Sequence, residues 1–107
     1  PLVLLVNKFT ASASEITAGA VQDYHVGTLV GEKTFGKGVV QSLYTLPDKG
    51  ALKITTARYV TPKGRDIHHK GIVPDVIVTQ LPTVPIDTPA DVQLSAAKKI
   101  IESKKDL

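Results

Sequence analysis

The stretch LVLLVNKFTASASEITAGAVQDYHVGTLV, residues 2–30, decides the fold of this 107-residue chain. It begins with an uninterrupted aliphatic run at residues 2–6, the pattern of a strand buried on both faces of a sheet. A helix is predicted from Ser12 to about Tyr24, because Ser12 and Glu15 have the S-x-x-E spacing of a capping box. A second short strand follows the helix. Strand, helix and strand in this order predict a crossover unit of an α/β domain.

We expect this helix to pack through a face of small and apolar residues. Ile16, Ala20 and Tyr24 recur at positions i, i+4 and i+8, and Ala13 and Gly19 lie near them. Such a face carries few bulky side chains. The sequence therefore predicts close packing of the helix on a sheet.

Beyond the second strand, at residues 28–30, the chain alternates strands with turns. Three further strands are predicted at residues 39–46, 51–60 and 75–78, the last as an edge strand. The first two of these form an antiparallel hairpin around the turn at residues 47–50. The order β-α-β-β-β, followed by the edge strand and then by a helix, predicts an α/β layered domain, with a mixed sheet and flanking helices.

The last part of the chain, residues 81–107, is predicted to be a Pro-rich connection followed by a C-terminal helix. Residues 81–89 hold three of the seven prolines, which favour an extended backbone. We expect Thr88 to be the N-cap of the helix, Pro89 its first residue and about Lys104 its end. Cations that complement the helix dipole follow in its last turns: Lys98, Lys99, Lys104 and Lys105.

Composition and charge exclude several classes of function. The net charge of +3 is spread along the chain and interleaved with acids, so no basic stripe predicts nucleic-acid binding. The absence of cysteine excludes disulfides and thiolate metal sites. No apolar run is long enough to span a membrane, and no signal peptide is visible. Because the chain opens on a strand-like run without Met, we expect it to be the interior or the end of a longer polypeptide.

A phosphate-binding loop is suggested by residues 31–38, GEKTFGKG, and has to be excluded. The stretch fits seven of the eight positions of G-x-x-x-x-G-K-[ST], but Gly38 stands where Ser or Thr would hold magnesium. A phosphate loop also opens into a helix, whereas the alternating, β-branched run that follows here predicts a strand. We therefore do not expect nucleotide binding.

Ser12 is a candidate nucleophile, although a Ser at this position is more often only a helix cap. The neighbouring residues 10–14 have small side chains, which leave room for a substrate carbonyl. A turn from strand to helix displays a hydroxyl at the edge of a sheet, as in other serine hydrolases. The amide of Ala13 would lie at the helix N-terminus, where a free N–H and the dipole can stabilise an oxyanion.

A serine nucleophile needs a base, and Lys37 is the better candidate for it. The histidines are His25, His68 and His69. The first lies at the far end of the helix, about 20 Å from Ser12 at 1.5 Å per residue, and the other two lie in a polar turn where we expect them to be solvated. Lys37 stands between two glycines that let the backbone bend toward the hydroxyl. Burial beside Phe35 and Val39 would favour its neutral amine, but taken alone it reads as a solvated loop lysine.

Ordered blocks of the sequence resemble the C-terminal processing (tail-specific) peptidase family. The blocks are TASASEI at 10–16, AGA at 18–20, QD at 22–23, LVGEKTFGKG at 29–38 and Gln41, followed by LKITTARY at 52–59, TPKGR at 61–65 and KGIVPD at 70–75. They extend over about residues 2–78. Several blocks in one order, at fitting separations, make this resemblance highly specific.

The resemblance implies a serine endopeptidase that cleaves proteins near their C-terminus through an acyl-enzyme. It assigns the nucleophile to Ser12, the base to Lys37 and the orientation of the lysine amine to Gln41, and it requires no metal or organic cofactor. The amide of Ala13 is the expected oxyanion donor. The implied fold is the spiral ββα arrangement of the Clp-protease and crotonase type.

The resemblance also implies how the chain is organised and where it acts. Residues 1–80 would form the C-terminal part of the catalytic domain, and we expect the PDZ domain and upstream catalytic strands of the family to lie outside this chain. Protein or peptide substrates are the expected partners, with no nucleic acid, and an extracytoplasmic location is expected: periplasm, outer membrane face or thylakoid lumen. A homo-oligomer and membrane association of the whole protein stay open. The alternative is a catalytically incomplete domain with a binding or assembly role.

Overall fold

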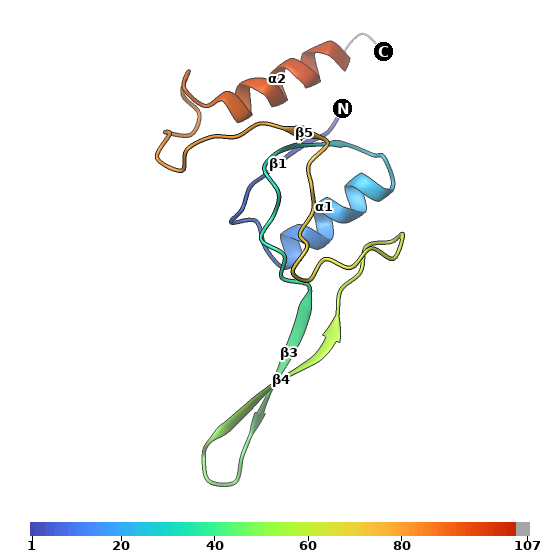
Figure 1. The fold of residues 1–107 in the computed structure, drawn as a ribbon, viewed down its shortest axis with the longest axis vertical. Coiled ribbons are helices and arrows are strands. Elements are labelled where there is room, and N and C mark those ends of the chain that lie inside the picture. Colours follow the sequence, from blue (N-terminus) through green and yellow to red (C-terminus); the bar gives the residue numbers. More distant parts are fainter. Residues whose placement is uncertain (105–107) are drawn as a thin grey trace.

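A computed structural model describes residues 1–104 and shows the element types in the predicted order (Figure 1). The elements are β1 (Val3–Val6), α1 (Ala13–Asp23), β2 (Thr28–Gly31), β3 (Val39–Thr45), β4 (Ala51–Arg58), β5 (Val76–Ile77) and α2 (Val92–Lys104). Lys105, which the sequence places near the end of the last helix, lies outside the described residues. Over residues 1–104, neither helix has the length and apolar character needed to cross a membrane.

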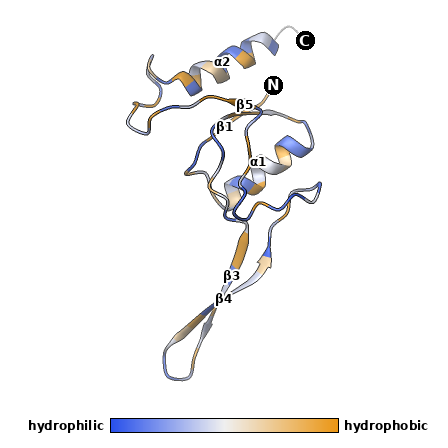
Figure 2. Cartoon of the chain, viewed as in Figure 1, coloured by the Kyte–Doolittle hydropathy of each residue, from blue (hydrophilic) through white to orange (hydrophobic). Residues whose placement is uncertain are grey.

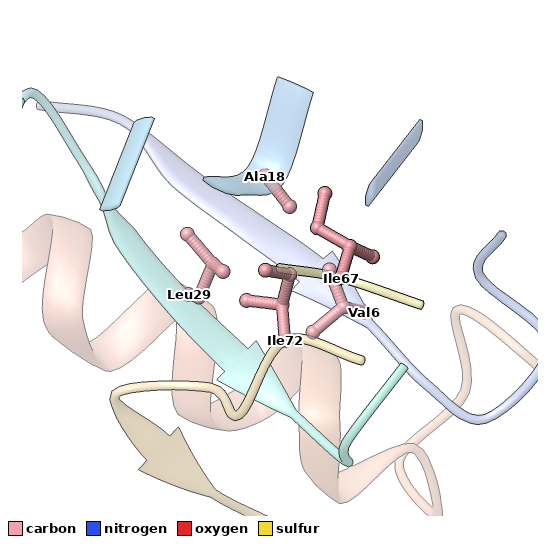
Figure 3. Packing of buried hydrophobic residues seen from close by; sticks show 5 residues of the cluster. All are labelled: Val6, Ala18, Leu29, Ile67 and Ile72. Atoms are coloured by element: carbon pink, nitrogen blue, oxygen red, sulfur yellow. The ribbon is translucent and has the colours of Figure 1, made fainter. Parts of the chain in front are cut away.

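The first three predicted elements form a crossover unit, as expected. β1 pairs in parallel with β2, and β2 pairs in parallel with β5, so the sheet order is β1-β2-β5. Helix α1 packs against β2, whereas α2 packs on β1 and β2. Figure 3 shows α1 in front of this sheet and α2 behind it. The predicted α/β layered class is thereby confirmed, with a helix on each face of the parallel sheet.

The hydrophobic core lies between the sheet and α1. Its buried cluster joins the two strands, the helix and the segment that follows β4, as Figure 3 shows: Val6, Ala18, Leu29, Ile67 and Ile72. Val30, the neighbour of Leu29, is also buried, and strand alternation directs it to the opposite face, where α2 lies. The burial on both faces that was predicted for residues 2–6 is therefore found in β2, whereas Leu5 of β1 is 44% exposed.

The buried face of α1 differs from the predicted one. Its buried residues are Glu15, Ala18, Gly19 and Asp23, whereas Tyr24 is 65% exposed. Apolar periodicity misses this face because two of its members are carboxylates. Each carboxylate is buried at acceptable cost only because hydrogen-bond donors surround it. The prediction that small residues allow close packing is right for Ala18 and Gly19.

The predicted hairpin is present, but it forms a sheet of its own. β3 and β4 pair antiparallel, with an irregularity in register between Val40 and Gln41. Figures 1 and 2 show the hairpin reaching away from the two helices, with apolar residues along it. Alternating strands are normally half-buried, whereas every residue of β4 is exposed. In residues 1–104 no strand pairing joins the hairpin to the parallel sheet, so the predicted mixed sheet is two separate sheets.

Helix α2 begins three residues later than predicted. It starts at Val92, and its N-cap is Asp91, whose Oδ1 accepts a hydrogen bond of 3.0 Å from the amide of Leu94. The hydroxyl of Thr88 instead donates to the carbonyl of Pro85. Asp is at least as favourable an N-cap as Thr, and the hydrogen bond to Leu94 makes Asp91 the cap here. Hydrogen bonds from the Leu94 and Asp87 amides hold the pKa of Asp91 below its usual range.

Asp23, at the end of α1, fastens the segment after β4 to this helix. Its carboxylate accepts hydrogen bonds of 2.9 Å from the Lys63 amide and from Nε of Arg65. The ion pair with Nη2 of Arg65 measures 2.5 Å. The Thr61 hydroxyl, followed by the Lys63 amide and Arg65, lowers the pKa of Asp23 from 3.8 to about 2, against the opposing effect of burial.

Replacing Asp23 by Asn should flatten the acid part of the stability profile. A carboxyl with a depressed pKa contributes stability that is complete above its unfolded value near 4 and is lost as the pH falls through about 2. Urea denaturation at pH 6, 4 and 3 should therefore show a steeper loss in the wild type than in Asp23→Asn. Parallel profiles for the two proteins would contradict this role of Asp23.

Candidate active site

Ser12 occupies a strained turn between β1 and α1. Its backbone has φ 57° and ψ −120°, a conformation that residues with a side chain rarely adopt. Its carbonyl accepts hydrogen bonds from the amides of Glu15 (2.9 Å) and Ile16 (3.1 Å), which start the helix. Strain of this kind costs about 1–3 kcal/mol and is typically found at functional sites. The prediction of a sharp strand-to-helix turn at Ser12 is confirmed.

Ala13, whose amide is the predicted oxyanion donor, follows Ser12 at the start of α1. Because Ala13 is the first residue of α1, its N–H has no acceptor within the helix. Among residues 1–104 no other backbone or side-chain group accepts a hydrogen bond from it. The positive end of the helix dipole adds to its ability to stabilise negative charge.

Glu15 is a buried carboxylate that joins the candidate nucleophile to the loop of the candidate base. Its side chain is 0% exposed. Oε2 accepts hydrogen bonds of 2.9 Å from the amides of Ser12 and Lys37, while Oε1 accepts 2.6 Å bonds from the Gly36 amide and the Thr34 hydroxyl. One carboxylate thus holds two backbone segments that are 25 positions apart in the sequence.

The loop between β2 and β3 is fixed from both sides. The Thr34 hydroxyl that donates to Glu15 also accepts a 2.7 Å hydrogen bond from the Ile72 amide. On the other side, the Phe35 amide donates to the Thr10 carbonyl at 2.9 Å. Gly36 has φ 95°, which only glycine adopts without strain. The prediction that glycine bends the chain beside Lys37 is right at this position.

His68 has a structural role, so the prediction that it is solvated is wrong. It is half-buried, and its Nδ1 accepts a 3.3 Å hydrogen bond from the Gly38 amide. The Gly38 carbonyl in turn accepts a 2.6 Å bond from the Tyr59 amide. Both backbone groups of the residue after Lys37 are therefore held. His69 is exposed, as predicted, with its ring 3.8 Å from that of His68.

The three predicted site residues Ser12, Lys37 and Gln41 line one cavity of about 310 Å³. Four further residues complete its lining: Val39, Val40, Lys53 and Tyr59. No hydrogen bond joins the side chains of Ser12, Lys37 and Gln41 to one another in the described part of the chain. The structure thus brings the residues together around one space without linking their reactive atoms.

The expected burial of Lys37 is wrong for the described residues. Lys37 is exposed, and so is Phe35, at 66%. Only its backbone is fixed, by Glu15 and by the bonds of Gly38, and the side chain extends from this anchored point. The strand that follows, β3, confirms that residues 31–38 do not open into a helix, which removes the nucleotide-loop interpretation.

Sequence reasoning missed several members of this site. Glu15 was recognised only as half of a capping box, which the structure contains, because nothing local indicates its bonds to Gly36 and Lys37. Lys53 and Tyr59 come from a different part of the hairpin and reach the cavity only through tertiary folding. The one available signal was their place in the blocks that resemble the peptidase family.

Comparisons with known proteins agree on one family. The profile of peptidase family S41 matches residues 1–78. The carboxyl-terminal-processing protease of Synechocystis sp. is 54% identical over 103 residues, which are 94% of this chain and 24% of that protein. The chloroplastic C-terminal processing peptidase of Tetradesmus obliquus is 53% identical over 76 residues, 71% of this chain and 16% of that protein. This chain spans about a quarter or less of the length of these curated relatives.

Solved structures show the same fold. A photosystem II D1 C-terminal processing protease matches with a TM-score of 0.72 and 51% identity, covering 74% of this chain and 20% of that one. The tricorn protease matches with a TM-score of 0.73 at 22% identity, covering 94% of this chain and 10% of that one, and at this identity it shows the fold alone. The Clp-protease-like fold implied by the resemblance is thereby confirmed.

The strain at Ser12 predicts that glycine is the more stable replacement. Ser12→Gly and Ser12→Ala both remove the hydroxyl, but only glycine adopts φ 57°, ψ −120° at little cost. Ser12→Gly should be more stable than Ser12→Ala by about 1 kcal/mol in urea denaturation. Equal stability, or a more stable Ala variant, would mean that the turn is not strained.

Replacing Glu15 by Gln should destabilise the protein by about 1–3 kcal/mol, because an NH₂ group replaces one of the accepting oxygens and leaves buried donors without a partner. Urea denaturation followed by circular dichroism measures this. Glu102→Gln, the same change on the exposed face of α2, is the control and should stay within about 0.5 kcal/mol of the wild type. A Glu15→Gln protein as stable as this control would contradict the assignment.

Proposed function

This chain belongs to peptidase family S41, and on this premise we propose that it carries the Ser–Lys dyad of a serine endopeptidase. Ser12 is the nucleophile, Lys37 the general base, and the substrate is a protein cleaved near its C-terminus. The observation that carries the proposal is that Ser12, Lys37 and Gln41 line one cavity. A buried carboxylate that binds the amides of both Ser12 and Lys37 supports it.

The chemistry begins with attack of the Ser12 hydroxyl oxygen on the scissile carbonyl carbon. The unprotonated amine of Lys37 takes the hydroxyl proton as the new C–O bond forms. When the tetrahedral intermediate collapses, the C–N bond breaks and the same proton passes to the departing amine. Water then attacks the resulting ester by the reverse set of proton transfers, which releases the new C-terminus and regenerates Ser12.

Two further groups assist this sequence. The free amide of Ala13, at the start of α1, donates to the oxygen that becomes negative in the intermediate. The side-chain amide of Gln41 orients the Lys37 amine from within the same cavity. Because the Lys37 side chain is exposed and only its backbone is held, it has the freedom to reach the hydroxyl once substrate fills the cavity.

We propose the substrate, location and organisation of this chain by analogy with the relatives. The names of the relatives describe carboxyl-terminal processing, and those from Tetradesmus obliquus and Arabidopsis thaliana are chloroplastic. By analogy, we assign this chain to the processing of protein C-termini in an extracytoplasmic compartment such as the thylakoid lumen or periplasm. Residues 1–80 form the C-terminal part of the catalytic domain in this proposal, and residues 81–107 form its connection and last helix.

A second function deserves a test because of one observation. Within residues 1–104, no hydrogen bond links Ser12 to Lys37, and Ala13 is the one oxyanion donor that we assign. A domain that binds substrate or a partner without cleaving it would also fit this arrangement. Binding of a peptide without Ser12-dependent cleavage would favour that alternative.

The dyad predicts how cleavage responds to substitution. Ser12→Ala and Lys37→Ala should each lower kcat for a protein or peptide substrate by more than about a thousandfold. Gln41→Ala should lower it by about ten- to a hundredfold, because the lysine loses its orientation but keeps its chemistry. Steady-state cleavage followed by mass spectrometry of the products measures all three.

Ser14→Ala is the matched control for this series. Ser14 lies in the first turn of α1, two positions after Ser12, is exposed, and does not line the cavity. Its replacement should leave kcat within about twofold of the wild type. Full activity of Ser12→Ala, or a loss in Ser14→Ala as deep as in Ser12→Ala, would overturn the assignment of the nucleophile.

A further inference from the structure

The cavity that holds the proposed dyad has a second lysine in its lining, Lys53, and no acid. Two of its seven lining residues are lysines, Lys37 and Lys53, and none is an acid. Glu15 is close to Ser12 in the sequence, but its carboxylate is fully buried and accepts hydrogen bonds from four donors. In the proposed mechanism the amine of Lys37 is neutral, so Lys53 is the cation that borders the space for substrate, and no acid of the lining faces it. Such a space attracts a carboxylate more strongly than a neutral group.

Lys53 reaches this cavity from β4, across the hairpin from the loop of Lys37. It pairs with Leu43, while Thr55, two residues further along β4, pairs with Gln41. Residues two apart on a strand project to the same face, so Lys53 lies on the face of Gln41. Diagonal neighbours on one face are about 7–8 Å apart, within the reach of a lysine side chain. The register thus explains why both residues line the cavity.

Lys53 forms no ion pair among the described residues. The pairs found there join Arg58 to Asp66, Arg65 to Asp23, and Lys98 to Asp87, and none involves Lys53. It also makes no side-chain hydrogen bond to a group in this part of the chain. Its ammonium group is therefore available to an incoming ligand. The valines of the lining, Val39 and Val40, supply apolar surface beside it.

We propose that Lys53 is a specificity-determining residue that binds a carboxylate of the substrate next to the scissile bond. The proposal rests on the proposed function, since it takes the cavity of Ser12 and Lys37 as the place of cleavage. The carboxylate has two sources: an Asp or Glu side chain close to the bond, or the terminal carboxylate of a substrate that is cut a few residues from its end. Lys53 positions the substrate and takes no part in the proton transfers.

The test compares four matched peptides with the wild type and three variants. The peptides share one cleavable sequence and carry Glu or Gln beside the bond, each with a free or an amidated C-terminus. The variants are Lys53→Gln, Lys53→Arg and Lys49→Gln. Lys49 lies in the hairpin turn and does not line the cavity, so it controls for a loss of charge alone. The readouts are kcat and KM for each pair, at low and high salt.

In one of the two comparisons, Glu against Gln or free against amidated C-terminus, the wild type should cleave the peptide with the carboxylate with a kcat/KM about fivefold higher. Most of this difference should be a lower KM. Lys53→Gln should lose this preference, while Lys53→Arg and Lys49→Gln keep it, and salt should reduce it. A preference for Glu over Gln identifies the side chain, and a preference for the free over the amidated terminus identifies the main-chain carboxylate.

Two results would overturn the proposal. One is Ser12-dependent cleavage with the same preference in the wild type and in Lys53→Gln. The other is loss of cleavage of all four peptides by Lys53→Gln while it stays folded, which would make Lys53 part of the catalytic machinery. Failure of the proposed function has a different signature, because Ser12→Ala would then cleave these peptides as well as the wild type does.

Discussion

The carboxylate of Glu15 is the interaction on which the candidate site depends. A fully buried anion is expensive unless donors surround it, and four groups do so: the amides of Ser12, Gly36 and Lys37, and the Thr34 hydroxyl. Three of them are backbone groups, so the carboxylate fixes the course of the chain more than the position of side chains. The same contact holds the strained turn of Ser12 and the loop of Lys37 in one arrangement.

Other constraints converge on that loop. The Thr34 hydroxyl accepts a hydrogen bond from the amide of Ile72, a residue of the core cluster. Hydrogen bonds with His68 and Tyr59 hold the backbone of Gly38. The core between the sheet and α1 therefore reaches the site through a short series of hydrogen bonds. The side chain of Lys37 is exposed, as our proposal of a base that meets the hydroxyl only after substrate has bound requires.

Local patterns were enough to predict the elements of the fold. The apolar run before Ser12, the S-x-x-E spacing and the turn at residues 47–50 predict β1, α1 and the hairpin, because each depends on neighbours in sequence. The buried face of α1 could not be predicted in this way. Glu15 and Asp23 are buried because partners distant in sequence, Lys37 and Arg65, supply their hydrogen bonds.

The residues of the site also divide into those that could be predicted from the sequence and those that could not. Ser12, Lys37 and Gln41 were assigned from ordered blocks that resemble a family, and the structure gathers them around one cavity. Lys53 entered no prediction, because its place depends on the register of β3 against β4. The start of α2 was wrong for a local reason, since Thr88 and Asp91 are both good caps and the hydrogen bond to Leu94 decides between them.

The most direct measurement of the central claim is to map the covalent adduct of a fluorophosphonate on the protein by mass spectrometry of its peptides. The reagent phosphonylates an activated serine and leaves ordinary hydroxyls unmodified. Our account predicts an adduct on Ser12, none on Ser14 two residues away, and loss of the adduct when Lys37 is replaced by Ala. An adduct on Ser14, or labelling of Ser12 that is unchanged without Lys37, would contradict it.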